Sequence, residues 1–142
     1  MNILFLTMVP IKEINDSNLY ADLMREFVKH GHYVGIVSPA ERRLNEETSF
    51  KEYGSNSILR VKVGNLQKTN IIEKGISTLM VESQFRNAIK KYYTDKRFDL
   101  IIYSIKLLII FNSFVAENDT LISLFWIPIL ELIILILLSD SK

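Results

Sequence analysis

The stretch Phe27-Val-Lys-His-Gly-His-Tyr-Val-Gly-Ile-Val-Ser38 decides the fold of this 142-residue chain. Its first residues close a helix predicted over Asn18–His30, in which apolar residues recur every three to four positions and form one stripe. Gly31 supplies the left-handed residue that commonly ends a helix. The remainder, Tyr33–Ser38, is an almost continuous apolar run that is typical of a strand buried on both faces, and Pro39 is expected to end it.

A second strand of the buried type is predicted at the amino terminus, over Asn2–Thr7. Between the two strands, Met8–Ser17 contains Pro10 and is expected to be a loop that ends in a helix N-cap. The order strand, helix and strand is that of a βαβ unit, whose two strands are parallel and whose crossover is right-handed.

The later part of the chain extends this pattern. Ile58–Val63 alternates apolar and basic residues after Leu59, which indicates a strand with one less buried face, nearer an edge of the sheet. Asn70–Tyr93 is predicted to be a long helix with a break at Gly75 as an alternative, and Phe98–Tyr103 a further buried strand. Ala40–Ser57 shows no periodicity that defines an element, although a short helix around Arg42–Phe50 is an option. The predicted fold class is therefore α/β, a Rossmann-like parallel sheet with helices on both faces, over residues 1–104.

Composition excludes several functional classes. The formal net charge is +1, so nothing indicates a nucleic-acid partner. The chain has no cysteine and only two histidines, His30 and His32, which offer too few ligands for a zinc site, and no metal is expected. The absence of cysteine is compatible with a reducing cytoplasm, and Met1–Pro10 lacks the basic region and cleavage site of a signal peptide. We therefore expect a cytoplasmic location, with the inner face of the plasma membrane as an alternative.

No phosphate-binding loop follows the first strand. That segment lacks both the Gly-x-Gly-x-x-Gly pattern and a Gly-Lys-Ser/Thr pattern, so close approach of the backbone to a pyrophosphate is disfavoured. Dehydrogenase and nucleotide-hydrolase functions are disfavoured for the same reason, and no cofactor is expected. In parallel sheets, ligands bind beyond the carboxyl ends of the strands, which here points to Thr7–Asn18, Ser38–Arg43 and the chain from Ser104 onward.

Most polar residues near these places have a simpler structural explanation. Ser17 and Asn18 could contact a ligand through the helix amino terminus, but capping is favoured. Arg42 and Arg43 could meet an anionic group, but solvated charges are favoured. Three carboxylates could act as acid or base, although the sequence pairs none of them with a partner: Glu41, Glu46 and Glu47.

Three segments resemble the N-terminal domain of bacterial GT-B glycosyltransferases, and most closely the retaining family-4 type that builds cell-surface polysaccharides. They are the opening Asn-Ile-Leu-Phe-Leu-Thr7, the stretch Phe27–Ser38 with its Lys-His-Gly-His-Tyr-Val segment, and Phe98-Asp-Leu-Ile-Ile-Tyr103. The family commonly has "Lys-x-Gly-His-x-Val" before the second strand. It also often has a Gly-rich first loop, from which this sequence departs.

The resemblance implies a function that this chain would perform only in part. In the family, the N-terminal domain receives the acceptor, and a second domain binds the nucleotide-sugar. Two such domains need at least about 200 residues, so the chain is expected to be a truncated enzyme, inactive alone, or an acceptor-side subunit with a separate donor-domain partner. The acceptor is a cell-surface polysaccharide or a lipid-linked sugar. The residues expected by position to contact it are Met8, Val9, Pro10, Ser17, Asn18, Ser38 and Ser104.

The likeness stops near Ser104, and residues 105–142 form an apolar tail that is expected to be mostly helical. Leu121–Leu138 carries one charge, Glu131, and one proline, Pro128. Three interpretations compete for this tail: part of the domain core, a membrane helix, or aberrant sequence joined to a genuine domain. The change in composition at Ser104, where the likeness stops, favours the third. A membrane helix needs about 20 apolar residues, and a central charge such as Glu131 opposes insertion. A small membrane-associated binding protein, with Leu121–Leu138 as its anchor, is the alternative to the glycosyltransferase.

Overall fold

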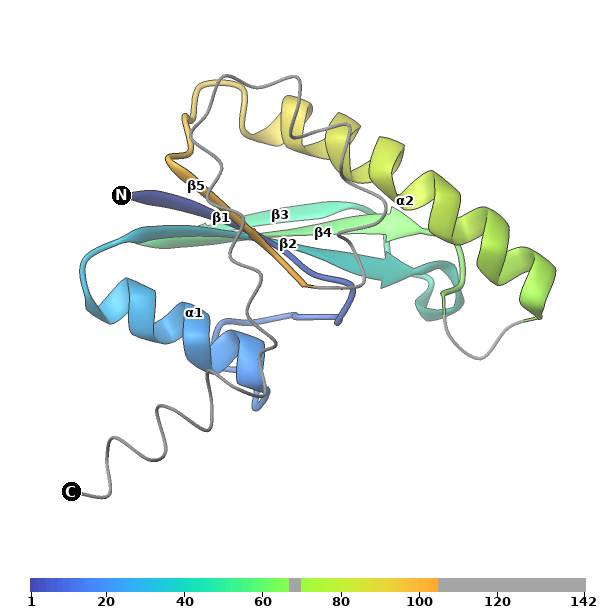
Figure 1. The fold of residues 1–142 in the computed structure, drawn as a ribbon, viewed down its shortest axis with the longest axis horizontal. Coiled ribbons are helices and arrows are strands. Elements are labelled where there is room, and N and C mark those ends of the chain that lie inside the picture. Colours follow the sequence, from blue (N-terminus) through green and yellow to red (C-terminus); the bar gives the residue numbers. More distant parts are fainter. Residues whose placement is uncertain (67–69, 105–142) are drawn as a thin grey trace.

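Five strands form one mixed sheet with a helix on each face (Figure 1). The computed structural model describes residues 1–66 and 70–104. The order of the strands across the sheet is β3-β4-β2-β1-β5. The elements along the chain are β1 (Asn2–Leu6), α1 (Leu19–Lys29), β2 (Tyr33–Glu41), the 3-10 turn η1 (Arg42–Leu44), β3 (Ser49–Tyr53), β4 (Asn56–Val63), α2 (Ile71–Tyr92) and β5 (Leu100–Tyr103).

The βαβ unit is confirmed. Strands β1 and β2 pair in parallel, with Asn2 opposite Tyr33. Helix α1 begins after Asn18, and Gly31, which follows its last turn, has a φ of 78° as the left-handed stop requires. The expected parallel pairing also holds for β2 with β4 and for β1 with β5.

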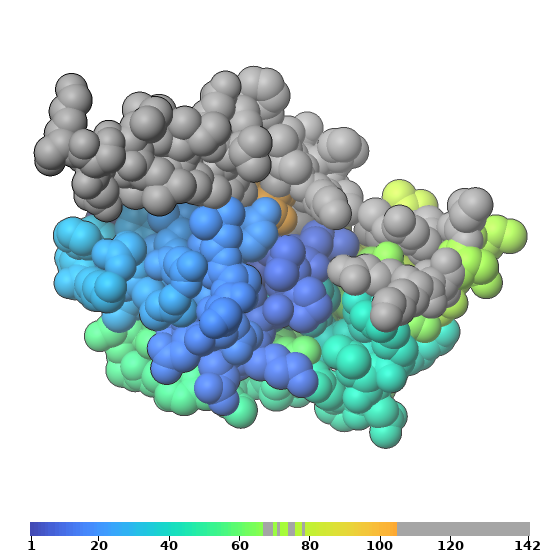
Figure 2. Space-filling model, turned by 90° about the horizontal axis from the view of Figure 1, so that it is seen from below, coloured from blue at the N-terminus to red at the C-terminus, as the bar shows by residue number. Residues whose placement is uncertain are grey.

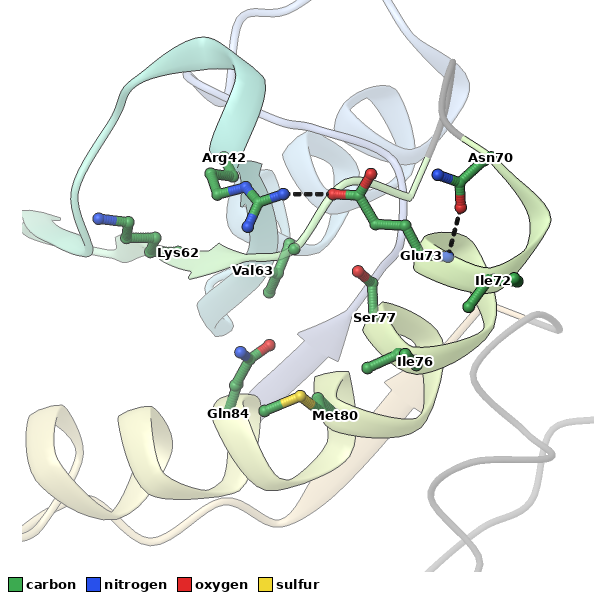
Figure 3. A pocket seen from close by; sticks show the side chains of 11 residues that line it. Arg42, Lys62, Val63, Asn70, Ile72, Glu73, Ile76, Ser77, Met80 and Gln84 are labelled. Atoms are coloured by element: carbon green, nitrogen blue, oxygen red, sulfur yellow. Dashed lines mark hydrogen bonds and ion pairs between the residues drawn. The ribbon is translucent and has the colours of Figure 1, made fainter.

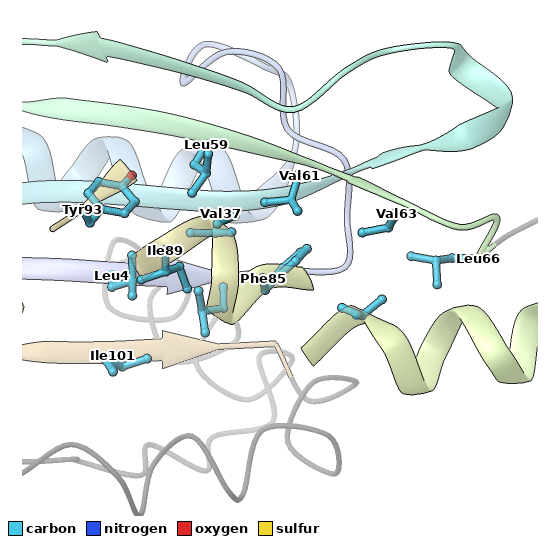
Figure 4. Close-up of a cluster of buried hydrophobic side chains, with 13 residues drawn as sticks. Leu4, Val37, Leu59, Val61, Val63, Leu66, Phe85, Ile89, Tyr93 and Ile101 are labelled. Carbon is cyan, nitrogen blue, oxygen red and sulfur yellow. The ribbon is translucent and has the colours of Figure 1, made fainter. Parts of the chain in front are cut away.

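Each face of the sheet has its own hydrophobic core because successive side chains of a strand point to opposite faces. Ile3 and Phe5 of β1 pack on the α1 side, together with Met24. Leu4 and Leu6 pack on the α2 side, where Phe85 of α2 is fully buried against them (Figure 4).

The expectation of an all-parallel sheet is wrong at one edge. Within the segment Ala40–Ser57, the expected short helix shrinks to η1, and Ser49–Tyr53 forms β3, which pairs antiparallel with β4. This edge strand is mostly exposed and polar, so it lacks the apolar run that marks an inner strand.

Strand β2 continues through Pro39 to Glu41, contrary to the expected end at Pro39. The backbone groups of Val37 point toward β1, since its carbonyl accepts the N–H of Thr7. Pro39, two residues on, has its nitrogen on the same side, beyond the last residue that pairs with β1. A proline there removes no hydrogen bond from the sheet, which is why the strand tolerates it.

Strand β4 lies one place in from the edge, between β2 and β3, and its basic residues differ in burial. Lys62 is exposed, but Arg60 is only 9% exposed. The expectation of a less buried face therefore holds at Lys62 but not at Arg60, which is buried by β3 and by the loop after β1.

Helix α2 runs without a break past Gly75. Figure 1 shows its first turns extending past the carboxyl ends of the strands. Several apolar residues of the first turns are accordingly exposed, by 76% at Ile72 and 80% at Leu79.

The apolar tail, with the segment Leu121–Leu138, lies outside the described residues. Within residues 1–66 and 70–104, no helix has the length and apolar character needed to cross a membrane.

Candidate functional site

The chain reverses its direction of travel across the sheet at β1. It moves from β1 to β2 and β4 on one side, and then returns through α2 to β5 on the other. The carboxyl ends of β1 and β5 therefore lie side by side, with Leu6 opposite Tyr103 and the N–H of Ser104 bonded to the carbonyl of Leu6 at 3.0 Å. Such a switch point is where α/β sheets commonly bind ligands.

Four of the residues expected from the sequence follow these two strand ends: Met8, Val9, Pro10 and Ser104. Val9 is 37% exposed, and its N–H donates to Thr7 Oγ1 at 3.0 Å. Ser104 is buried, and its hydroxyl has no hydrogen-bond partner among the described residues. The switch point thus combines a turned first loop with one uncommitted hydroxyl.

Of the other three expected residues, Ser17 and Asn18 end the first loop and Ser38 lies in β2, next to β1. Two of the three have structural roles. Ser38 is buried, and its hydroxyl donates to the carbonyl of Ile11 at 2.9 Å, which holds the first loop on the sheet. Asn18 Oδ1 accepts the N–H of Ala21 at 2.9 Å, so it caps α1. Ser17 is exposed beside it.

A cavity of about 610 Å³ lies at the same edge of the sheet, between the end of β4 and the first half of α2 (Figure 3). None of the seven residues expected to contact the acceptor lines it. Its lining residues are Arg42, Lys62, Val63, Gly64, Asn70, Ile72, Glu73, Ile76, Ser77, Met80 and Gln84.

The polar side of this cavity is an ion-pair network. Arg42 Nη2 bonds Glu73 Oε1, which also accepts from Asn65 Nδ2 at 2.9 Å. Lys62 Nζ lies 2.6 Å from Glu47 Oε1. Both cations stay partly exposed, so they could contact an anionic group of a ligand while keeping these carboxylates nearby.

The other side of the cavity is apolar and open. Ile72, Ile76 and Met80 project from α2 and are each at least half exposed (Figure 3). Gln84 also lines the cavity, and its Oε1 is buried and lacks a hydrogen-bond partner among the described residues. The cavity therefore offers an apolar wall and two partly exposed cations to one ligand.

The three carboxylates that the sequence left without partners do have them. Arg43 Nε bonds Glu41 at 2.9 Å, and Lys62 bonds Glu47. Glu46 is shared between two cations, Lys12 and Arg60. Arg42 and Arg43 are both exposed, as the favoured interpretation of solvated charges expects, and each also forms an ion pair.

Sequence reasoning missed Glu73, Ser77 and Gln84 as cavity residues. Arg42 could be selected because it lies just beyond the carboxyl end of a predicted strand. No nearby sequence pattern, however, shows that α2 begins beyond the carboxyl ends of the strands. Only that overhang places Glu73 and Gln84 around the cavity. Among the described residues, no group of three or more His, Cys, Asp or Glu side chains is placed to hold a metal ion.

Comparison with protein-family models finds no family that matches the chain, and no curated protein matches its sequence.

Proposed function

We propose that this chain is the acceptor-binding part of a GT-B type glycosyltransferase and works with a separate donor-binding domain. The reaction would transfer a sugar from a nucleotide-sugar to a cell-surface polysaccharide or a lipid-linked acceptor. The observation that carries the proposal is the cavity beside α2, which combines an apolar wall with the cations Arg42 and Lys62 at the carboxyl edge of the sheet. This lining favours the lipid-linked acceptor.

The first loop supports an acceptor role over a nucleotide-binding role. A phosphate-binding loop needs free backbone N–H groups. Here the carboxylate of Asp16 accepts the N–H of Lys12 at 2.7 Å and that of Glu13 at 3.3 Å. The loop is thus closed by its own anion, and a pyrophosphate would have to displace it.

The cavity lining fits an amphipathic anion. An isoprenoid or acyl chain would lie against Ile72, Ile76 and Met80, which gains the free energy of removing apolar surface from water. The phosphate that joins such a chain to its sugar would lie near Arg42 and Lys62. The sugar could then extend along the edge toward the switch point at Ser104.

The transfer itself would need groups from the donor domain. An acceptor hydroxyl oxygen forms a bond to the anomeric carbon, the bond to the nucleoside diphosphate breaks, and the hydroxyl proton passes to a base. Glu41, Glu46 and Glu47 are engaged in ion pairs and lie in no catalytic pair. We therefore expect the chain alone to bind acceptor without turning over.

Calorimetric titration of the full chain with farnesyl phosphate, farnesol and UDP-glucose tests the binding half of the proposal. We expect farnesyl phosphate to bind best, because only it meets both the cations and the apolar wall. Met80→Asp and Arg42→Gln should each weaken it about tenfold or more. Leu79→Asp, on the same helix but outside the cavity lining, and the exposed Arg97→Gln are the matched controls.

Preferential binding of UDP-glucose, or equal losses in the Leu79 and Met80 variants, would overturn the acceptor role. A transfer assay with the isolated chain tests the other half. Turnover without any second protein would refute the need for a separate donor domain.

A further inference from the structure

A second, smaller cavity lies on the α1 side of the sheet, where three segments meet around Arg60. Arg60 is the register partner of Ser38 on the neighbouring strand, and Ser38 holds the carbonyl of Ile11. That bond places the next residue of the loop, Lys12, beside Arg60. Figure 2 shows this side of the molecule, with the first loop and α1 in blue and the η1–β3 segment in teal.

Strand β3 closes the cavity from the edge of the sheet. Ser49 is opposite Arg60 and Lys51 is opposite Ile58, so both lie on the α1 face. The enclosed volume is about 250 Å³, which is smaller than the roughly 300–1,000 Å³ typical of sites for drug-sized ligands. A single small polar molecule or one sugar unit matches this size.

The charges around the cavity leave an excess of one cation. Lys12, Lys51 and Arg60 face Glu13 and Glu46. Glu46 bonds both Lys12, at 3.0 Å, and Arg60 Nη1. The hydrogen bond from Lys12 holds the pKa of Glu46 below its usual range, so this carboxylate stays ionised. Lys51 has no carboxylate within ion-pair distance among the described residues.

The guanidinium of Arg60 is the unusual feature. The residue is 9% exposed, and its Nε and Nη2 are buried with no hydrogen-bond partner among the described residues. A buried unsatisfied donor costs about 1–3 kcal/mol, so such groups are normally bonded to protein, water or ligand. These two N–H groups form one of the two edges of arginine that match a carboxylate with two parallel bonds, and the other edge includes Nη1, which contacts Glu46.

We propose that this cavity is a binding site for the carboxylate of a small organic acid or of an acidic sugar. Binding requires the Arg60 side chain to turn its free edge toward the cavity, while Nη1 keeps its contact with Glu46. The carboxylate accepts from Nε and Nη2, and Lys51 adds a third, more exposed contact. A monoanion balances the single excess charge, whereas a dianionic phosphate would overcompensate it. The site is separate from the cavity beside α2 and does not rest on the function proposed above.

The test is a set of ¹H–¹⁵N NMR titrations of the full chain that follow the Nε–H signal of Arg60. The probes are acetate, glucuronate, glucose and inorganic phosphate at constant ionic strength. We expect saturable shifts with at least one of the two carboxylates and none with glucose. A response to acetate alone points to a free small acid, and one to glucuronate alone points to an acidic sugar.

Arg60→Lys keeps the charge but loses the two-bond edge, so it should lower carboxylate affinity about tenfold or more. Lys51→Gln should lower it several-fold without disturbing the core, and this variant stays informative if Arg60→Lys fails to fold. The control is Lys90→Gln, an exposed change on α2. The proposal is overturned if neither carboxylate shifts the Arg60 signal, if phosphate binds more tightly than both, or if Lys51→Gln and Lys90→Gln behave alike.

Discussion

Gly64 lies so close to Ser77 that a Cβ atom on residue 64 would be 2.1 Å from Ser77 Oγ and 2.9 Å from Ser77 Cβ. Residue 64 directly follows β4, and Ser77 is on α2. This contact sets how closely the helix approaches the strand end at the back of the cavity. Only a glycine leaves room for this contact. The requirement is steric, because φ at residue 64 does not lie in the left-handed region that favours glycine.

We therefore expect Gly64→Ala to destabilise the protein by about 1–3 kcal/mol, the usual cost of overpacking. Urea denaturation measures it. Ser77→Ala should rescue only part of the loss, because its Cβ still clashes, and Ser77→Gly should rescue more of the steric cost. If Gly64→Ala is as stable as the original chain, the close approach of α2 to β4 is wrong.

Ser38→Ala should cost about 1–3 kcal/mol because the buried carbonyl of Ile11 then lacks its hydrogen bond. The same variant should loosen the first loop, which hydrogen exchange at Lys12 and Glu13 would detect. Ser17→Ala is the control, since Ser17 is exposed and should change stability by no more than about 0.5 kcal/mol. Equal effects of the two substitutions would contradict the anchoring role of Ser38.

Asn18→Ala should cost about 1 kcal/mol through loss of the cap on α1, and Asn18→Asp should restore most of it. Thermal unfolding monitored by circular dichroism measures both. Ligand binding separates capping from a direct role: if Asn18→Asp folds normally yet loses acceptor affinity, Asn18 does more than cap the helix.

The parts of the fold that depend on local patterns could be predicted from the sequence. Continuous apolar runs located β1 and β5, and Gly31 located the end of α1. The pairing of strands that are distant in the sequence could not be predicted in this way. Strand β3 has an exposed, polar sequence with no pattern typical of a strand, and it is defined by its pairing with β4. The extension of β2 through Pro39 depends on where β1 stops pairing with it.

The position of a candidate site could be predicted from the sequence only where the site directly follows the end of a strand. The segments after β1, β2 and β5 could be named from the sequence, because every parallel strand of such a sheet ends at the same edge. That β1 and β5 are neighbours and form a switch point became clear only from the structure. The cavity beside α2 depends on a helix that begins beyond that edge, and the cavity at Arg60 depends on the position of β3. Neither relationship is encoded in the spacing of nearby residues, so both required the structure.

Tyr93 connects α2 to the sheet through a buried hydroxyl. Its Oη lies 2.7 Å from Ser57 Oγ, which also accepts a hydrogen bond from Tyr33. Burial raises the pKa of Tyr93 above its ordinary value of 10.0, and the Ser57 hydrogen bond only partly opposes this. In the folded protein Tyr93 thus keeps its proton at a pH where the unfolded chain has begun to lose it.

The sign of the resulting pH dependence follows from proton binding. Below about pH 10 both states hold the proton, and the full contribution of Tyr93 to stability is present. Above it the unfolded state binds fewer protons, so the free energy of unfolding falls by up to about 1.4 kcal/mol per pH unit from this group. Tyr93→Phe should cost about 1 kcal/mol at neutral pH and remove this part of the alkaline slope.

Urea denaturation between pH 8 and about pH 11 measures the effect, with Tyr53→Phe as the matched control because Tyr53 is 48% exposed. Burial also raises the pKa of Tyr103, so some alkaline slope should persist in the Tyr93 variant. The stability gap between the original chain and Tyr93→Phe should narrow above pH 10, and it should narrow by more than the gap between the original chain and Tyr53→Phe. A gap that is constant with pH would mean that Tyr93 ionises as readily in the folded state as in the unfolded one, and that its hydroxyl is not buried between α2 and the sheet.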